Sequence, residues 1–260
     1  MSSSATVALI TAGSAGLGAA AARAFAKSGY RVAVNYANND ARALALVAEL
    51  PALSPLPLGD EGGEGGGKNF VAIKADLGSR DEIGRLVRDA VARFGRLDVV
   101  FSNGGWTQFR GLSSIDKNAY EDEWDKSFNI NVKSHLWLMQ VAKPHLDATE
   151  GAFISTASVA GVKPGGSSLA YSVTKAAQLH LMRALAGMAA PKVRVNSVSP
   201  GLLLTDWADM FPDELKEATR QRSKLQRLAT VEDVAEQVLT LARSRSTTGI
   251  NVVIDGGIML

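Results

Sequence analysis

The sequence alternates between short, continuous apolar runs and longer segments that are amphipathic or rich in alanine. The apolar runs predict strands at Val7–Thr11, Arg31–Tyr36, Asn69–Lys74, Leu97–Ser102, Ala152–Thr156, Val193–Val198 and Ile250–Ile254. The longer segments predict helices at Leu17–Ser28, Ala41–Leu50, Arg80–Phe94, Tyr120–Leu146, Tyr171–Met188 and Val231–Ser244. Strands that are apolar throughout suit a parallel sheet covered on both faces. We therefore predict an α/β fold: a doubly wound, mostly parallel seven-stranded sheet with helices on both faces.

Length and composition limit the chemistry, the partners and the number of domains that this chain can have. Of the 260 residues, 46% are hydrophobic and none is cysteine, which excludes disulfides, thiolate nucleophiles and cysteine-ligated metals. Lys and Arg number 28 and Asp and Glu 26, a balance too even to favour nucleic acid as a partner. One domain of this size can bury a sufficient core, so we predict a single domain over residues 1–260.

Residues 51–68 interrupt the alternation. They hold three prolines and six glycines, and so cannot bury enough apolar surface to offset the entropy of ordering. We predict a mobile surface loop inserted before the third strand, with a functional lid as the less favoured alternative. No run of about 18 apolar residues is present, and Val7–Ile10 is too short for a signal peptide. We therefore predict a cytoplasmic protein without membrane contact.

A glycine-rich turn, Thr11–Gly18, joins the first predicted strand to the first predicted helix. Its glycines would let a pyrophosphate approach the backbone, and the helix N-terminus would attract the phosphate charge. The Gly-x-x-Gly-x-Gly spacing differs from the usual dinucleotide fingerprint, so a tight turn without a ligand is the alternative. Asp76-Leu77 and Asn103-Gly104-Gly105 follow two further predicted strands. Strand ends of this kind converge on one crevice, although each residue could instead cap a helix.

Three residues suggest acid–base chemistry at the same edge of the sheet. Ser158 follows the fifth predicted strand, and Tyr171 and Lys175 share one face of a helix at i and i+4. An ammonium beside a phenol favours the phenolate, so we expect a lowered Tyr171 pKa and a competent acid or base. Ser158 could donate a hydrogen bond to a carbonyl oxygen that gains charge. Taken alone, Tyr-x-x-x-Lys is more often a surface pair.

Together these motifs resemble the short-chain dehydrogenase/reductase family in its compact form with one Rossmann domain. The resemblance runs from Thr11 to Gly257 over seven motifs: Thr11–Gly18, Ser102–Gly105, Asn131, Ser158, Tyr171 with Lys175, Pro200-Gly201 with Thr205, and Asp255–Gly257. It implies hydride transfer between NADP or NAD and a ketone, aldehyde or alcohol. The chain departs from the family at Ala12, where Gly is usual, and at Ser102–Gly105, where Asn-Asn-Ala-Gly is usual. We expect Gly13 to absorb the turn at position 12.

The resemblance also implies a role for individual residues. In the catalytic tetrad, Tyr171 would exchange the proton with the substrate oxygen, and Ser158 would polarise the carbonyl. Lys175 would lower the pKa of Tyr171 and bind the nicotinamide ribose. Asn131 would hold a water that links Lys175 to solvent. The implied cofactor-binding residues are Thr11, Gly13, Ser14, Gly16, Leu17, Gly18, Asn35, Tyr36, Asp76, Leu77, Asn103, Gly104, Gly105, Tyr171, Lys175, Pro200, Gly201, Leu203 and Thr205.

The end of the second predicted strand bears on the choice of cofactor. Positions 35–39 contain no acid that would accept a ribose 2′-hydroxyl and repel a 2′-phosphate, so NADP is favoured over NAD. Against this, Ala15 stands where NADP-preferring members often carry Arg or Lys.

An apolar substrate pocket is expected from Trp106, Phe109, Trp207, Met210 and Phe211, although core or interface packing is nearly as plausible. Arg220, Arg222, Lys224 and Arg227 could meet an anionic substrate or an acyl-carrier partner, but a solvated helix face is favoured. The three histidines lack metal-ligand spacing, so no metal site is predicted.

The sequence leaves other functions open and indicates self-association. A nucleotide sensor or scaffold without turnover is the main alternative to an enzyme, and an enoyl reductase or sugar epimerase is a third possibility. We also predict a homotetramer or homodimer, because the two longest predicted helices carry surplus apolar residues: Trp137, Leu138, Met139, Leu179, Leu181 and Met182. These could instead pack under the 51–68 loop.

Overall fold

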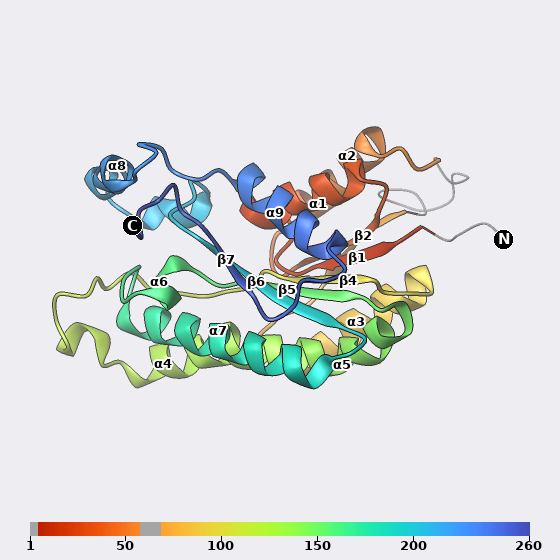
Figure 1. Ribbon diagram of the computed structural model, residues 1–260, viewed down its shortest axis with the longest axis horizontal. Coiled ribbons are helices and arrows are strands. Elements are labelled where there is room, and N and C mark those ends of the chain that lie inside the picture. The colour runs from red at the N-terminus through yellow and green to blue at the C-terminus, as the bar shows by residue number, and fades with distance from the viewer. Residues whose placement is uncertain (1–4, 58–68) are drawn as a thin grey trace.

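The computed structural model describes residues 5–57 and 69–260, within which the strands form one seven-stranded sheet (Figure 1). Its order is β3-β2-β1-β4-β5-β6-β7, and every pair of neighbours is parallel. The strands are β1 Val7–Ile10, β2 Arg31–Tyr36, β3 Phe70–Lys74, β4 Val99–Ser102, β5 Ala152–Thr156, β6 Arg194–Pro200 and β7 Asn251–Ile254. The predicted doubly wound sheet is confirmed, with strand ends shifted by at most two residues.

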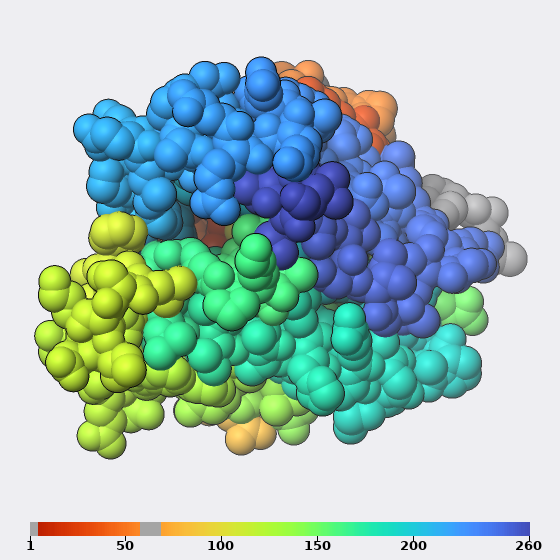
Figure 2. All heavy atoms as spheres, turned by 60° about the vertical axis from the view of Figure 1, so that its left-hand side comes forward, coloured from red at the N-terminus to blue at the C-terminus, as the bar shows by residue number. Residues whose placement is uncertain are grey.

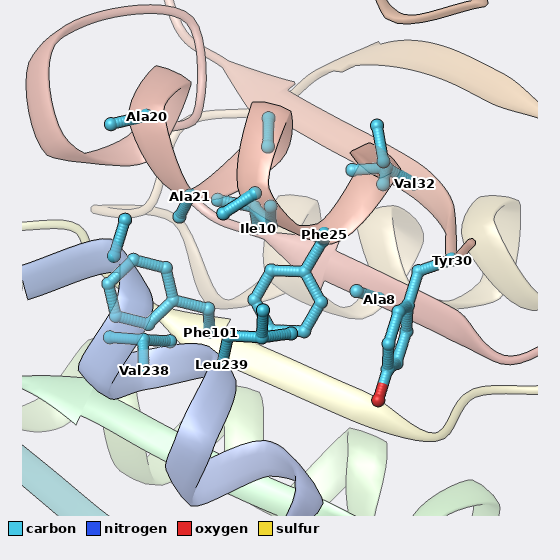
Figure 3. Packing of buried hydrophobic residues seen from close by; sticks show 14 of the residues in the cluster. Ala8, Ile10, Ala20, Ala21, Phe25, Tyr30, Val32, Phe101, Val238 and Leu239 are labelled. Atoms are coloured by element: carbon cyan, nitrogen blue, oxygen red, sulfur yellow. The ribbon is translucent and has the colours of Figure 1, made fainter. Parts of the chain in front are cut away.

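Helices cover both faces of this sheet (Figure 1). One face carries α1 Gly16–Lys27, α2 Asp40–Leu53 and α9 Val231–Arg243. The other carries α3 Arg80–Phe94, α5 Ser134–Thr149 and α7 Leu169–Ala189. In the first layer, Phe25 of α1 packs beside Phe101 of β4 and Leu239 of α9, with Ala20 and Ala21 nearby (Figure 3). Small alanine side chains let α1 lie close to α9, and burying each phenylalanine contributes about 1.5–3 kcal/mol.

The strand order reverses between β1 and β4. From this point β2 and β3 extend in one direction and β5, β6 and β7 in the other. The β1–α1–β2 crossover goes to one face and the β4–α5–β5 crossover goes to the other, so a crevice opens at the carboxyl ends of β1 and β4. The glycine-rich turn after β1 and Asn103 after β4 therefore meet there.

The segment Tyr120–Leu146 is helical as predicted, but a π-helical turn interrupts its α-helical pattern. It contains α4 Glu121–Phe128, the π-helical turn η2 Asn129–Lys133, and most of α5. The wider turn places Asn131 toward the loop after β4, to which its side chain is bonded. A π-turn of this kind often occurs at functional sites.

Several short elements were not predicted. They are η1 Asp116–Asn118, α6 Val159–Val162, η3 Asp206–Met210 and α8 Asp213–Arg222. Helix α8 has no buried residue, so it lacks the apolar period from which helices were predicted. Helix α2 continues past Leu50 to Leu53, where both leucines pack on the core. The predicted loop therefore begins later than residue 51, and its residues 58–68 lie outside the described residues.

The expected surplus of apolar residues is smaller than predicted. Leu138, Met139 and Met182 are core residues, because they pack under α5 and α7 against the sheet. The exposed apolar side chains on this side of the molecule are instead Phe128, Leu136, Val173 and Met188. In the described part of the chain, no helix is both long and apolar enough to cross a membrane.

Candidate active site

The turn after β1 is held by Asn35, a buried residue of β2. Its Oδ1 accepts a hydrogen bond from the Ala12 N–H at 3.1 Å, and its Nδ2 donates to the Ala75 carbonyl at 3.0 Å. Ala12 itself has a left-handed backbone, with φ at 47°. The expectation that Gly13 would absorb this turn is wrong, because Gly13 is absent from the left-handed glycines among the described residues.

Steric limits explain the glycines of the turn. A Cβ at Gly13 would lie 2.9 Å from the Ile10 carbonyl oxygen, and one at Gly18 would lie 2.3 Å from the Ala12 oxygen. Gly16 has φ at 48°. Ala15, the N-cap of α1, makes no capping side-chain bond, and the first turn of α1 carries no acid. The α1 N-terminus therefore offers free N–H groups and a positive dipole end, which fits a phosphate.

A cavity of about 590 Å³ begins at this turn and runs along the ends of β4, β5 and β6. Figure 2 shows its opening between the atoms of α8 and those of residues 159–170, with atoms of the N-terminal turn at the bottom. The predicted residues that line it are Gly16, Leu17, Asn103, Gly105, Ser158, Tyr171, Lys175, Pro200, Gly201, Leu203, Thr205, Trp207 and Phe211. Residues that were not predicted also line it, among them Lys163, Leu215 and Met259. Of the four cations considered for an anionic substrate, Arg222 lines the cavity.

Other predicted residues do not line this cavity. They are Thr11, Gly13, Ser14, Gly18, Asn35, Tyr36, Asp76, Leu77, Gly104, Trp106, Phe109, Asn131 and Met210. The Thr11 hydroxyl accepts a hydrogen bond from the Asn103 N–H at 2.9 Å, joining the ends of β1 and β4. The Trp106 ring lies 4.7 Å from the Lys126 ammonium. Phe109 makes an edge-on contact with Phe211, with 5.3 Å between ring centroids, and so supports the wall from behind.

Ser158 and Tyr171 come together at the cavity wall. Both residues line the cavity, and the Ser158 side chain favours the Tyr171 phenolate, although the residues are thirteen apart in sequence. The Ser158 hydroxyl also accepts from the Ala160 N–H at 3.1 Å, which caps α6. Trp207 of η3 covers the tyrosine, with 6.2 Å between ring centroids. Two hydroxyls side by side in an apolar wall can both bond to one carbonyl oxygen.

The lysine does not act on the tyrosine as the sequence analysis expected. Burial raises the pKa of Tyr171 to about 12, and the hydrogen bond with Ser158 opposes the shift. The Lys175 ammonium lies 5.6 Å from the Tyr171 ring centroid and bonds elsewhere, to the Thr156 carbonyl at 2.8 Å. Burial also lowers the pKa of Lys175 to about 7. The expected lowering of the tyrosine pKa is therefore wrong for the protein alone, since desolvation of the phenolate dominates.

Asn131 fastens the π-turn η2 to the loop after β4. Its Oδ1 accepts from the Trp106 N–H at 2.7 Å, and its Nδ2 donates to the Trp106 carbonyl at 2.9 Å. The same nitrogen also donates to the Thr174 hydroxyl at 3.0 Å. Both ends of the side chain thus hold protein groups, and Asn131 shapes the floor of the cavity.

Sequence reasoning missed a group of buried polar residues behind Lys175. Gln178 accepts from the Lys175 ammonium at 2.9 Å, and its amide nitrogen lies 3.0 Å from Nε2 of His135. Neither His135 nor Gln178 was predicted as a site residue. A signal was present: Gln178 follows Lys175 by three positions, so both lie on one face of α7.

Comparisons with known proteins found a matching family and several similar proteins. Residues 11–259 match the family described as enoyl-(acyl carrier protein) reductase. A protein named as ketoacyl reductase 2 of the granaticin polyketide synthase, from Streptomyces violaceoruber, is 36% identical over 258 residues, covering 97% of this chain and 96% of that protein. A 3-oxoacyl-(acyl-carrier-protein) reductase of Staphylococcus aureus is 32% identical over 257 residues, covering 97% and 98%. The structure of a short chain dehydrogenase from Burkholderia cenocepacia in complex with NADP superposes with a TM-score of 0.84, at 31% identity over 98% of each chain.

Proposed function

Because the chain belongs to the short-chain dehydrogenase/reductase family, we propose that it reduces a ketone or aldehyde to an alcohol with NADPH, in the cytoplasm. The observation that carries the proposal is that the hydroxyl side chains of Ser158 and Tyr171 both line the wall of one cavity, with Lys175 beside them. Both hydroxyls are placed to bond the oxygen of a bound carbonyl. NADH and the reverse oxidation are the nearest variants of the same proposal.

The cofactor site fits the residues present. The uncapped start of α1 and the close approach at Gly13 and Gly18 would receive the pyrophosphate. Lys175 uses two of its three N–H donors on Thr156 and Gln178, which leaves one for a ribose hydroxyl. The bound nicotinamide supplies the hydride, and the chain's own groups orient the carbonyl and supply the proton.

The proton would come from Tyr171. A phenol with its pKa raised to about 12 is protonated at neutral pH, which suits the donor in a reduction. Ser158 would donate its own hydrogen bond to the same oxygen as negative charge develops there. Asn131 joins the loop of Trp106 to the π-turn η2 and to Thr174, the residue before Lys175 on α7. These bonds would help to hold Lys175 at the cavity floor.

NADP is proposed over NAD because the rim near β2 carries cations and no exposed acid at positions 36–39. Arg42, at the start of α2, pairs with Asp206 at 2.5 Å, and Lys74, at the end of β3, pairs with Asp40 at 3.1 Å. Both cations are exposed and could exchange these carboxylates for a 2′-phosphate. Asn35 supports this rim and does not contact the cofactor, because its buried side chain is hydrogen-bonded to the backbone at Ala12 and Ala75.

The substrate we propose is a 3-oxoacyl thioester or another apolar ketone. The named relatives are ketoacyl and oxoacyl reductases, and the cavity wall includes Trp207, Phe211 and Leu215. An enoyl reductase is the second candidate, favoured by the description of the matching family. The Ser158–Tyr171 pair argues for a carbonyl oxygen as the reacting group. With Tyr171 and Lys175 both present, a sensor without turnover is disfavoured.

The experiment is a substrate panel in which nicotinamide absorbance is followed with each cofactor. A 3-oxoacyl thioester, a matched enoyl thioester and simple apolar ketones are supplied to the same enzyme. We expect oxidation of NADPH with the ketones and the oxoacyl thioester. Turnover of the enoyl thioester alone would favour the second candidate, and binding of cofactor without turnover of any substrate would favour the sensor.

A further inference from the structure

The buried residues behind Lys175 form a continuous hydrogen-bonded chain. The Lys175 ammonium donates to Gln178 Oε1 at 2.9 Å. The Gln178 amide nitrogen is bonded to Ser155 Oγ at 2.5 Å and lies 3.0 Å from His135 Nε2. His135 Nδ1 lies 2.6 Å from Ser102 Oγ. All five side chains are buried, and they come from β4, β5, α5 and α7.

The direction of each bond in this chain follows from the ammonium. An ammonium can only donate, so it must face the oxygen of the Gln178 amide. The amide nitrogen then faces Ser155, the Thr156 carbonyl and His135. An amide nitrogen cannot accept a hydrogen bond, so an N–H on His135 Nε2 would oppose it; the imidazole therefore carries its proton on Nδ1 and donates to Ser102. A flipped amide would set its N–H groups against the ammonium. Gln178 therefore has one orientation, and His135 has one tautomer.

Several features of this chain favour holding Lys175 in place over conducting protons. It ends at Ser102 and Ser155, which are 2% and 0% exposed, so it has no exit to solvent. An amide N–H stands in its middle, and Tyr171 is not part of it. Protonating His135 would oppose both the Gln178 N–H and the nearby ammonium, and burial with Lys175 lowers the pKa of His135 to about 3.

We propose that Gln178 is a positioning residue that fixes the Lys175 ammonium at the cavity floor and sets its charge state, with His135 and Ser155 fixing Gln178 in turn. This rests on the proposed function only in so far as Lys175 contacts the cofactor. Among the described residues, the ionisable groups facing Lys175 are Tyr171 on α7 and His135 on α5. Its hydrogen-bond acceptors are neutral, so charge on the ammonium is stabilised by dipoles and opposed by burial.

The variants that test this change the charge and length of one acceptor. Gln178→Met removes the acceptor oxygen but keeps a side chain of similar volume, and the Lys175 ammonium is then expected to titrate at a lower pH. Gln178→Glu places a carboxylate there, and the ammonium then titrates at a higher pH. Each shift is expected to be about one pH unit or more. In His135→Leu, the titration midpoint of Lys175 is expected to shift in the same direction as in Gln178→Met, but by less. Gln140→Met, on the exposed face of α5, is the matched control.

The readout that needs no cofactor is NMR of the protein labelled at lysine Cε, with Lys175→Met used to assign the signal. Opposite shifts in Gln178→Met and Gln178→Glu support the proposal. Equal midpoints in wild type and both folded variants would overturn it. If Gln178→Met does not fold by circular dichroism, Gln178→Glu and His135→Leu carry the same comparison of midpoints.

The second readout is NADPH binding, followed by fluorescence across the same pH range. The pH at which affinity is lost should move with the Lys175 midpoint in each variant. Affinity in Gln178→Met at neutral pH should fall about tenfold, as expected when a charged group loses a hydrogen-bond partner. A uniform loss of affinity with an unmoved midpoint would indicate a structural role alone and contradict the proposal. If the wild type binds neither NADPH nor NADH, the proposed function fails while the NMR result still stands.

Discussion

Asn35 and Ala12 are joined by a hydrogen bond of 3.1 Å that runs from the Ala12 N–H to the Asn35 side-chain oxygen. The bond holds an alanine in the left-handed region, with φ at 47°, at the point where the sheet changes direction. Asn35 is 1% exposed, and its amide nitrogen is used by carbonyl groups of the β3 segment. The geometry of the glycine-rich turn after β1 thus depends on a side chain of the neighbouring strand, β2.

Ala12→Gly is expected to stabilise the protein by about 0.5–1 kcal/mol, because glycine adopts positive φ without the steric cost that alanine bears. The free energy of unfolding in urea measures it. Ala20→Gly, inside α1, is the control and should destabilise by about the same amount. A loss of stability in both variants would show that Ala12 is not strained.

Ala37→Asp is expected to shift preference from NADP toward NAD, because the exposed carboxylate would repel a 2′-phosphate and accept a ribose hydroxyl. The ratio of kcat/KM for the two cofactors measures this. Asn35→Asp should weaken both cofactors equally, since its carboxylate would face the Ile73 and Ala75 carbonyl groups. A wild type that already prefers NAD would contradict our interpretation of this rim.

Tyr171→Phe is expected to reduce ketone turnover by about 10²–10⁴-fold while NADPH binding stays nearly unchanged, because only the proton donor is removed. Steady-state rates and fluorescence titration measure the two effects. Tyr120→Phe, at an exposed tyrosine before α4, is the control and should retain activity. Turnover in Tyr171→Phe within about threefold of wild type would refute its catalytic role.

His135 should make the protein less stable in mild acid. Its folded pKa of about 3 lies below the value of 6.5 in the unfolded chain, so the unfolded state binds the extra proton first. Stability from this residue is present above pH 6.5 and is lost as the pH falls, by about 2 kcal/mol at pH 5. Urea unfolding at pH 7.5 and 5 measures the loss. His135→Gln should reduce it, whereas replacement of the exposed His180 should not.

Val173→Glu is expected to lower the molecular mass measured in solution if α7 forms an interface between copies of the chain. Val173 is an exposed apolar side chain of α7, and a charge there would oppose its burial between copies. Light scattering should give the wild type at least twice 27.4 kDa. Leu44→Glu, at an exposed leucine of α2, is the control. A wild-type mass near that of one chain at all concentrations would rule out the predicted homodimer and homotetramer.

Much of the fold was predictable because its signals are local. Runs such as Val7–Ile10 and Val99–Ser102 are apolar at every position, and this alone indicates strands buried on both faces. The glycines of the first turn, and Tyr171 and Lys175 one helical turn apart, likewise depend on spacing within a few residues. Ser158 could be assigned to the same edge because it follows a predicted strand.

What only the tertiary structure decided depends on distance in sequence. Gln178 and His135 are 43 residues apart, and Asn35 is 23 from Ala12, so no local period marks either pair. The tyrosine pKa was predicted from an i, i+4 neighbour, but burial by segments from elsewhere in the chain outweighs that neighbour. Sequence periodicity determines which face of an element is buried. Which polar groups share that burial, and so which charges and tautomers they adopt, follows only when the packed elements exclude water.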